Sequence, residues 1–386
     1  MRHPVWLWLV FSGGAAVMSL AQQRFVEAPP RPVPVIAYVD IVVVGGNEGG
    51  MAAAWRAASL GAKVMLLNEY TFLGGETASK DRFDPDGPAP ASAFGSALFS
   101  ALTQSNYSSR FPVTAASLLQ GAGVTFLCNT RHGGVLTDAG GRLCGVVTAN
   151  KAGLQAIVAK IVIDATPAGT VADMAGAQRP PWPAATLSVS RPRYTADSAQ
   201  RELVALDAPM PDFTWPLINR AEHALREEWH SDVKAPLAHS MDFIMPNPVI
   251  GAATLHDAEL PAPADLDLGV CQPAGTERVF VIGSSCAVSR EAAAALMRPV
   301  TLADVGERLG ELALHASRQV TLPPDDAIAV KTAPPERETL PELTIRQMRE
   351  RERPFRTGND AAVRQARDAI PVWGEYDVVV VGSGPS

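Results

Sequence analysis

The chain has 386 residues, of which 47% are hydrophobic and 19% are charged, and its net charge is −7. This composition is typical of a globular protein with a sizeable core and excludes a disordered or repetitive chain. The negative net charge argues against a nucleic-acid partner, because binding to a phosphate backbone requires a basic face.

Residues 1–21 have the pattern of a secretory signal peptide. A positively charged start precedes an apolar run at 5–20, and the sequence SLA at 19–21 supplies the small residues that a cleavage site needs. The apolar run is short and contains Ser and Gly, which disfavours a membrane anchor. We therefore expect a secreted or periplasmic protein that retains no stable membrane span after cleavage.

After a proline-rich entry, a strand–turn–helix–strand unit begins. The run Ile41–Val44 predicts a buried parallel strand, which leads into the glycine-rich turn GGNEGG. The alanine-rich stretch Met51–Leu60 predicts a helix that ends at Gly61, and Lys63–Leu67 predicts a second strand. This order is that of a dinucleotide-binding unit, which receives a pyrophosphate at the N-terminus of its helix.

Residues 123–166 contain short apolar runs separated by turn signals, which predict a β-meander. Its last run, Ile161–Thr166, is apolar enough to return as a parallel strand of the central sheet. Residues 179–272 are rich in Pro, Trp, Asp and His and predict an inserted α+β cap domain with a helix at Leu217–Trp229. The sheet then resumes at Arg278–Ile282, and a helix is predicted at Leu302–Ala316.

Residues 319–372 are dominated by Pro, Glu, Arg and Asp, and we expect a linker that packs loosely on the surface. The glycine turn then recurs in the sequence YDVVVVGSGPS at 376–386. We interpret 373–386 as the truncated start of a second dinucleotide-binding domain. The first such domain is expected to be discontinuous and to comprise 38–178 and 273–318.

The first glycine turn departs from the usual motif G-x-G-x-x-G. Gly45 supplies the tight turn and Gly50 allows the helix to pack close to the strand. Asn47 replaces the middle glycine, and its side chain crowds the pyrophosphate, although asparagine tolerates a positive φ. At the end of the second strand, Asn68 stands in the ribose position with Glu69 one residue later. Whether Glu69 binds the ribose or points into solvent stays open.

Three segments together carry a more specific resemblance. They are DIVVVGGNEGGMAAAWRAASLGAKVMLLNEYTFLGG, IVIDAT and VFVIGSSCAVSREAAAALMRPVTLADVGERLGELAL. They resemble the FAD-binding segments of the FAD-dependent oxidoreductase superfamily. The resemblance is strongest to a secreted bacterial group with two tandem FAD modules, some of which are labelled xanthan-lyase-related. It covers residues 39–317 and resumes at the terminal repeat.

The resemblance implies FAD as cofactor, a small-molecule substrate, and a second FAD module in the full-length chain. It also implies an α/β fold, with a Rossmann-like central parallel sheet, a β-meander and the inserted cap. The pyrophosphate of FAD would meet Gly45, Gly46, Asn47, Gly50 and Thr166. The adenosine would meet Asn68, Glu69 and the backbone of His132. The ribityl chain would meet Gly74 and Gly75, and the flavin would meet Gly283, Gly306 and Gly310.

The sequence also departs from the pattern of this family at two further positions. A glycine and an acid are expected after IVIDAT, where Pro167 and Ala168 stand, and Ser284 replaces the arginine or acid expected after Gly283. Together with Asn47, these changes weaken FAD binding rather than abolish it. They also motivate a second hypothesis, a non-catalytic module that supports an intact second FAD domain. Lyase activity rests on the group label alone, and the sequence contains no lyase constellation.

Oxidation of a substrate by flavin often requires a base, and the cap contains histidines that are candidates for this role. We select His239 as the candidate catalytic base. His223 and His230 lie seven positions apart on a predicted helix, a spacing that fits either two metal ligands or a solvated face. Without a third ligand in register, no metal site is predicted. His223, His230 and His256 are the other candidates for the base.

Four cysteines in a chain of this length form neither a disulfide framework nor a metal-binding spacing. Cys128 and Cys144 flank a predicted turn, so that a disulfide and two buried free thiols are both open interpretations.

Overall fold

The computed structural model describes residues 24–28, 30–75, 78, 89–100, 102–103, 107–178, 186–194, 201–209, 224, 256, 259–331, 361–372 and 377–379. The chain divides into two compact units. The smaller unit includes β1 (Arg24–Ala28) and β13 (Asp368–Val372), which pair in antiparallel fashion. The larger unit comprises residues 30–334 and 349–366 and contains the nucleotide-binding elements.

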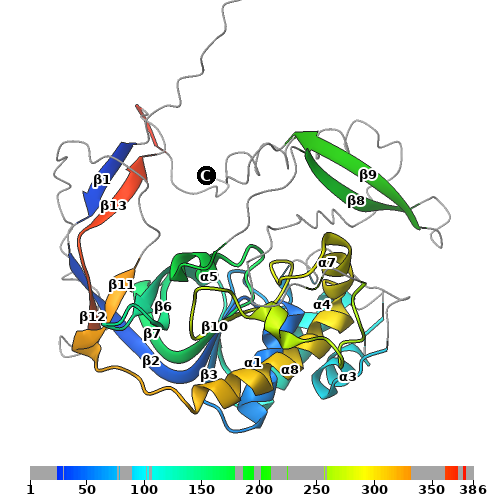
Figure 1. Cartoon of the computed structure of the whole chain (residues 1–386), viewed down its shortest axis with the longest axis horizontal. Coiled ribbons are helices and arrows are strands. Elements are labelled where there is room, and N and C mark those ends of the chain that lie inside the picture. Colours follow the sequence, from blue (N-terminus) through cyan, green and yellow to red (C-terminus); the bar gives the residue numbers. More distant parts are fainter. Residues whose placement is uncertain are drawn as a thin grey trace, which may run out of the picture. The chain divides into compact units, whose positions relative to one another are not determined.

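The centre of the larger unit is a parallel sheet with the strand order β10-β7-β2-β3-β4 (Figure 1). Its strands are β2 (Arg31–Val44), β3 (Val64–Leu67), β4 (Thr125–Leu127), β7 (Gly153–Asp164) and β10 (Val279–Val281). Helices cover both faces, which is why β2 ends in an unbroken apolar run. The predicted α/β fold with a Rossmann-like central parallel sheet is confirmed.

The β-meander is also present. β5 (Arg131–Thr137) and β6 (Leu143–Asn150) pair in antiparallel fashion, and β6 pairs in the same way with the first half of β7. Both β2 and β7 are long strands with three partners each: β2 pairs with β12, β3 and β7, and β7 pairs with β6, β10 and β2.

Residues 319–372 were expected to be a linker, and this expectation is wrong for two parts of the segment. β11 (Ala329–Lys331) pairs with β5, and β12 (Ala362–Gln365) pairs with the start of β2. The two short strands also pair with each other, so the path β2-β7-β6-β5-β11-β12 returns to β2. Ile328 and Val363 are buried in the apolar cluster that fills the meander, which explains why this charged segment returns to the sheet.

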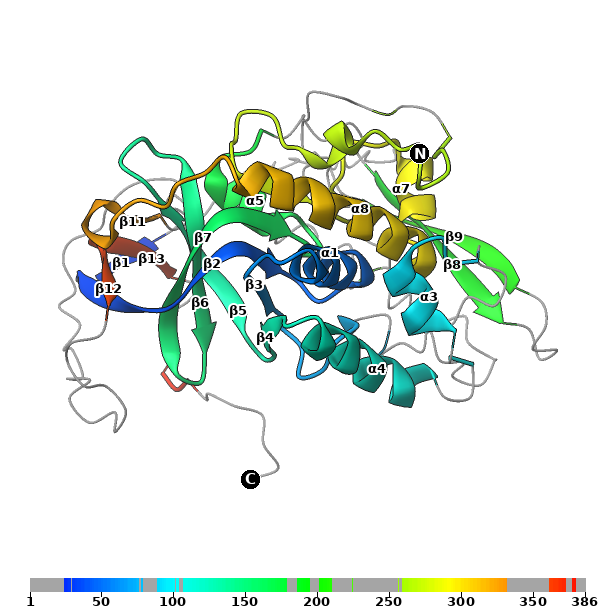
Figure 2. The same ribbon diagram turned by 90° about the horizontal axis from the view of Figure 1, so that it is seen from below.

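Four helices lie on one face of the parallel sheet, and Figure 2 shows α8 next to α1 and α1 next to α4. They are α1 (Glu48–Ser59), α3 (Ala93–Phe99), α4 (Tyr107–Gly121) and α8 (Pro299–Ser317). The other face is covered by α5 (Thr170–Ala175), whose Val171 and Ala172 belong to the apolar cluster on that side of the sheet. A further short helix, α7 (Arg290–Leu296), precedes α8.

α1 and α8 approach each other at two glycines. A Cβ atom on Gly306 would lie 2.2 Å from the carbonyl oxygen of Gly49, and one on Gly310 would lie 2.3 Å from that of Ala53. The ion pair between Arg56 and Glu311, 2.8 Å long, joins the same two helices. Gly306, which was expected near the flavin end of the cofactor, is therefore required for helix packing.

α8 also holds the start of α3. The buried carboxylate of Asp304 accepts hydrogen bonds from Ala91 N at 3.0 Å and Ser92 N at 2.9 Å, and Glu307 accepts one from Phe94 N at 2.8 Å. These carboxylates satisfy backbone donors at a helix N-terminus, where negative charge is stabilised.

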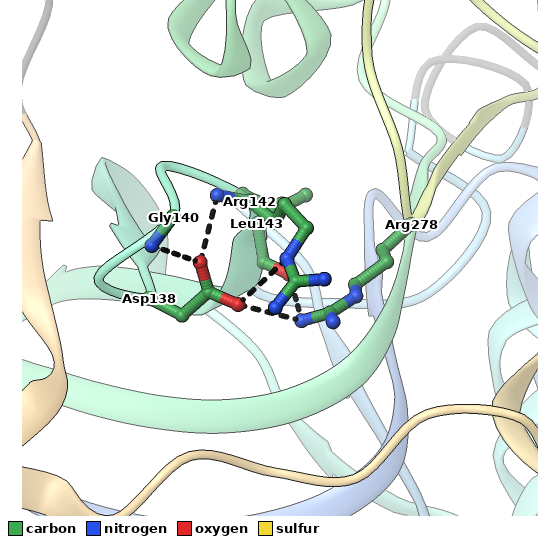
Figure 3. Close-up of polar contacts among 5 residues, drawn as sticks. All are labelled: Asp138, Gly140, Arg142, Leu143 and Arg278. Atoms are coloured by element: carbon green, nitrogen blue, oxygen red, sulfur yellow. Dashed lines mark hydrogen bonds and ion pairs between the residues drawn. The ribbon is translucent and has the colours of Figure 1, made fainter.

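A second charged cluster joins the turn of the meander to β10 (Figure 3). The carboxylate of Asp138 accepts bonds from Gly140 N at 2.9 Å, from Arg142 N and Nε at 3.0 Å each, and from Arg278 Nη1 at 3.3 Å. Burial raises the pKa of Asp138, but the donors of Arg142 and Gly140 outweigh this effect and hold it below its ordinary value. Arg278 adopts a φ of 63°, which costs energy for a residue with a side chain.

Within the inserted segment 179–272, the described residues form an antiparallel pair, β8 (Thr186–Tyr194) and β9 (Arg201–Pro209), and a short 3-10 helix, η1 (Leu268–Cys271). A second 3-10 helix, η2 (Asp325–Ala327), precedes β11. The signal peptide and nearly all of the predicted helix Leu217–Trp229 lie outside the described residues. Every helix in the described ranges is too short or too polar to span a bilayer.

Substitution of Gly306 by Ala tests the close contact between α1 and α8. The added methyl group overlaps the backbone of Gly49, so we expect the free energy of unfolding to fall by about 1–3 kcal/mol. Gly121→Ala is the control, because a Cβ atom there meets nothing within 4 Å. Alanine is the better helix former by about 0.5–1 kcal/mol, so the control should be neutral or slightly stabilising. Equal denaturant midpoints for the two variants would contradict this account.

The Asp138 cluster makes a pH-dependent contribution to stability. Because the pKa of Asp138 is lowered in the folded protein, its stabilising effect is present above the unfolded value of about 3.9 and disappears as the pH falls through the folded pKa. Asp138→Asn should lower the free energy of unfolding at neutral pH by about 1–3 kcal/mol, since Arg278 loses its buried counterion.

The measurement is denaturant unfolding of both proteins over an acidic to neutral pH series, in which the two curves should converge at low pH. Arg142→Ala serves as a control, because the Arg142 side chain is 53% exposed against 13% for Arg278. Its loss should stay below about 1 kcal/mol. A constant difference between wild type and Asp138→Asn at every pH would exclude the charge as the cause.

Candidate functional site

The predicted glycine turn lies between β2 and α1, against the carboxyl end of β7. Gly45 has a φ of 116°, and a Cβ atom there would lie 2.2 Å from the carbonyl oxygen of Ala165. A Cβ atom on Gly50 would lie 2.4 Å from the carbonyl oxygen of Gly45. Both glycines are therefore required for the close packing of the turn, as predicted from the motif.

Asn47 caps α1 with its own side chain. Its Oδ1 accepts a hydrogen bond from Gly50 N at 2.8 Å, and its Nδ2 donates to the carbonyl oxygen of Ala165 at 2.9 Å. The φ of Asn47 is −74°, so the tolerance of asparagine for a positive φ is not the reason for its presence here. The side chain instead occupies a backbone donor at the helix N-terminus, where a pyrophosphate would be received.

Glu48, which the sequence analysis did not single out, is buried in the first turn of α1. A carboxylate at this end of a helix is favoured by the helix dipole, but it has the same sign of charge as a pyrophosphate. The sequence could have indicated this role, because Glu48 is an acid inside the glycine motif.

The two residues at the end of β3 differ in their surroundings. Asn68 is buried, and its Nδ2 donates to the carbonyl oxygens of Tyr70 at 3.0 Å and Phe72 at 2.7 Å, so the amide holds the following loop. Its Oδ1 lies close to Gly46, since a Cβ atom there would be 2.7 Å away. The side chain of Glu69 is 40% exposed and 3.9 Å from Arg131. Of the pair, Glu69 therefore has the more accessible side chain for the ribose hydroxyls.

The loop after Asn68 is tied to the glycine turn. Gly74 N donates to the carbonyl oxygen of Gly46 at 3.0 Å, and both Gly74 and Gly75 have a positive φ. A Cβ atom on Gly74 would lie 2.3 Å from the ring of Phe111 in α4, so this glycine allows close packing.

A buried hydrogen-bonded chain begins at the end of β7. Asp164 accepts bonds from Thr166 N at 3.0 Å, Thr166 Oγ1 at 2.6 Å and Ala172 N at 2.9 Å. The hydroxyl of Thr166 is 3.2 Å from that of Thr170, which is 2.7 Å from Nε2 of His132. His132 was expected to act through its backbone, but its imidazole is part of this hydrogen-bonded chain.

Burial has the largest effect on the pKa values of the two ionisable groups in this hydrogen-bonded chain. It raises the pKa of Asp164 and lowers that of His132, while the nearby carboxylates of Asp164 and Glu69 oppose the latter shift. The chain fixes Thr166 and the start of α5 at the end of the strand. Asp164 and Thr170 were missed because their roles depend on contacts between β7, α5 and β5.

The turn after β10 faces the first glycine turn. Gly283 lies beside Asn47 and Met297, since a Cβ atom there would meet Asn47 Nδ2 at 3.8 Å and Met297 Sδ at 4.0 Å, which are ordinary van der Waals contacts. Ser284 donates to the carbonyl oxygen of Pro167 at 3.1 Å. Ser285 is 1% exposed, and within the described part of the chain its hydroxyl has no hydrogen-bond partner. A buried hydroxyl of this kind is suited to a bound group.

The candidate base His239 lies outside the described residues, as do His223 and His230. His256 is described: it forms a β-bridge with Val288, and its Nε2 is 2.9 Å from the carbonyl oxygen of Glu259. In the described ranges, no three His, Cys, Asp or Glu side chains gather in a group that could hold a metal ion.

These residues fit a dinucleotide such as FAD. The glycine turn and the accessible carboxylate of Glu69 could supply its contacts, while Asn47 partly fills the pyrophosphate position.

Residues 40–180 match the family model described as FAD dependent oxidoreductase. This segment is therefore similar to a family of oxidoreductases that use FAD. Over 36 residues, the chain is 44% identical to the thiamine thiazole synthase of Aeropyrum pernix; this stretch is 9% of this chain and 13% of that protein.

Two solved structures are similar over 73% of this chain. One is THI4 of Thermovibrio ammonificans, with 14% identity, a TM-score of 0.38 and 91% of its own chain covered. The other is a geranylgeranyl bacteriochlorophyll reductase-like protein of Thermoplasma acidophilum, with 15% identity, a TM-score of 0.43 and 79% covered.

Substitution of Asn47 by Gly tests whether its side chain competes with the pyrophosphate. The change frees Gly50 N for a bond to a charged phosphate, worth about 1.5–3 kcal/mol, so FAD should bind roughly tenfold more tightly or better. Stability should fall by about 1–2 kcal/mol, because glycine is an acceptable N-cap but the bond from Asn47 to the carbonyl oxygen of Ala165 is lost as well. The measurement is titration of apoprotein with FAD, followed by flavin fluorescence.

Asn47→Asp is the matched variant, since it keeps the cap but adds a negative charge where the phosphates bind. Its FAD affinity should fall below that of the wild type. If Gly and Asp at this position leave the affinity unchanged, Asn47 does not lie at the pyrophosphate.

Proposed function

We propose that the chain is an exported FAD-dependent oxidoreductase that transfers a hydride from a small organic substrate, such as a carbohydrate, to flavin. The observation that carries the proposal is that the two glycine turns lie at the carboxyl ends of β2 and β10, the two parallel strands that flank β7, and that Asn47 of the first turn lies beside Gly283 of the second. Ligands of open α/β sheets bind at this end of the strands. The family match over residues 40–180 supports FAD as the ligand.

When bound, FAD supplies a two-electron acceptor. The residues of this chain bind and orient it. The N-terminus of α1 faces the pyrophosphate, and the carboxylate of Glu69 accepts bonds from ribose hydroxyls. In this proposal, the turn at Gly283 and the nearby Met297 would lie against the planar ring of FAD.

In this proposal, a histidine of the inserted segment removes the second proton from the substrate. His239 remains the first choice for this base. The bridge between His256 and Val288 is an argument for His256 as the second choice, because Val288 follows the turn at Gly283 in the same loop.

The alternative is a non-catalytic module that supports a second FAD domain. It is favoured by the side chain of Asn47, which already satisfies a donor at the N-terminus of α1, and by the replacements Pro167 and Ser284. The second glycine-turn sequence at 376–386 supports the presence of such a domain in the full protein. Of this sequence, Asp377, Val378 and Val379 are described and lie outside the strands.

Flavin spectroscopy separates the two functions. For the oxidoreductase, we expect protein incubated with FAD and then freed of unbound cofactor to retain the visible flavin bands. Anaerobic addition of a panel of sugars and hydroxy acids should then bleach these bands with at least one compound. His239→Ala should slow the bleaching without removing the bound flavin.

A protein that shows no flavin band after incubation would exclude the oxidoreductase function for this chain. Retained flavin that chemical reductants bleach, but that no member of an extended substrate panel bleaches, would favour the non-catalytic module.

A further inference from the structure

Two cysteines that the sequence analysis did not pair lie in contact. Cys271, the last residue of η1, and Cys286, in the loop after β10, have their Sγ atoms 3.7 Å apart. They are 0% and 1% exposed, respectively. The pair considered from the sequence, Cys128 and Cys144, consists of a half-buried and a buried free thiol.

The backbone holds the two cysteine segments side by side. Ala287 N donates to the carbonyl oxygen of Val270 at 2.9 Å, so the neighbours of both cysteines are directly hydrogen-bonded. A disulfide requires an Sγ–Sγ distance of about 2.05 Å. The remaining gap can be closed by rotation of the side chains, because the main chains already lie together.

We propose that Cys271 and Cys286 form a disulfide when the protein folds under oxidising conditions, and that this bond fixes the turn 283–285 beside the nucleotide-binding turn. The bond joins positions 15 residues apart. It restricts the unfolded chain and therefore stabilises the fold. The proposal rests on the contact between the thiols and does not depend on FAD binding.

The oxidant is a small disulfide such as oxidised glutathione, which reacts by thiol–disulfide exchange. The thiolate of one cysteine attacks a sulfur of oxidised glutathione, which forms a mixed disulfide and releases one glutathione thiolate. The thiolate of the other cysteine then attacks the protein sulfur of the mixed disulfide and releases the second glutathione. The two protein thiols lose two electrons and two protons, and one glutathione disulfide becomes two thiols.

The order of folding and oxidation follows from the surroundings of the pair. Cys271 has a pKa well above its ordinary value because its thiol is hydrogen-bonded to Cys286 and buried. Cys286 donates a hydrogen bond to the carbonyl oxygen of Val281 at 3.4 Å. Both thiols are buried, so a glutathione disulfide cannot reach them in the folded protein, although the hydrogen bond from Cys271 lowers the pKa of Cys286. The bond therefore forms while the segment is open, during folding.

The bond has a direct consequence for the candidate site. Cys286 N donates to the carbonyl oxygen of Gly283 at 3.2 Å, and Ser285 lies between the two residues. A fixed Cys286 therefore restricts both the backbone of Gly283 and the position of Ser285.

The test uses the full 386-residue chain without added FAD. One sample is folded with a mixture of oxidised and reduced glutathione and another with dithiothreitol, and a natively purified sample is exposed to the same buffers. Remaining thiols are alkylated under denaturing conditions, and the digested protein is mapped by mass spectrometry. We expect a cross-linked peptide pair that contains Cys271 and Cys286, and an oxidised protein whose Tm is higher by roughly 2–5 °C.

Two single variants complete the test. In Cys271→Ala, the cross-link and the oxidation-dependent rise in Tm should both disappear, whereas Cys128→Ala should keep both. Amide hydrogen exchange at 283–289 should slow on oxidation in the proteins that form the cross-link. It should not change in Cys271→Ala. The proposal is overturned if all four cysteines stay alkylatable after oxidation in both the refolded and the native samples, or if the cross-link joins a different pair.

Discussion

β2 and β7 pair in parallel from Val35 and Ala156 to Val44 and Asp164, and both the meander and the nucleotide-binding sheet are built on this pairing. Their first halves carry β12 and β6, while their second halves carry β3 and β10. The pairing also sets the position of the candidate site, because the turn of Gly45 leaves β2 beside the end of β7. A shift in register would separate Gly45 from Ala165 and Asn47 from its acceptor at the same time.

The sequence was most informative where a local pattern determines the structure. The apolar run at the end of β2, the alanine-rich α1 and the turn at Gly45 follow from strand and helix periodicity and from the need for a positive φ. β11 and β12 were missed because three or four residues in a charged segment give no periodic signal, and their burial depends on partners far away in the sequence. Likewise, nothing local to Gly306 distinguishes a glycine that packs against a helix from one that faces a cofactor.

The candidate site was predictable in its outline but not in its details. The glycine turn and Glu69 follow from the motif, whereas the bonds of Asn47 to both Gly50 and Ala165 require the tertiary structure. These two bonds explain how a residue with a side chain is accommodated at a position that glycine usually occupies. The asparagine replaces part of what a phosphate would contribute, so the turn keeps its geometry through contacts of the protein itself. The same neighbourhood contains the buried carboxylate of Glu48, which makes the helix N-terminus less dependent on an anionic ligand.

The strand β12 gives the meander an unusual order of assembly. Arg31 at the start of β2 is hydrogen-bonded to Gln365 of β12, 334 positions away, so the last pairing of this sheet closes a very long loop. During synthesis, the start of β2 emerges long before its partner and has an open edge in the interval. Pro32 and Pro34 lie on this edge opposite Arg364 and Ala362. Because proline lacks a backbone donor, these residues limit the pairing of the open edge with other chains until β12 is available.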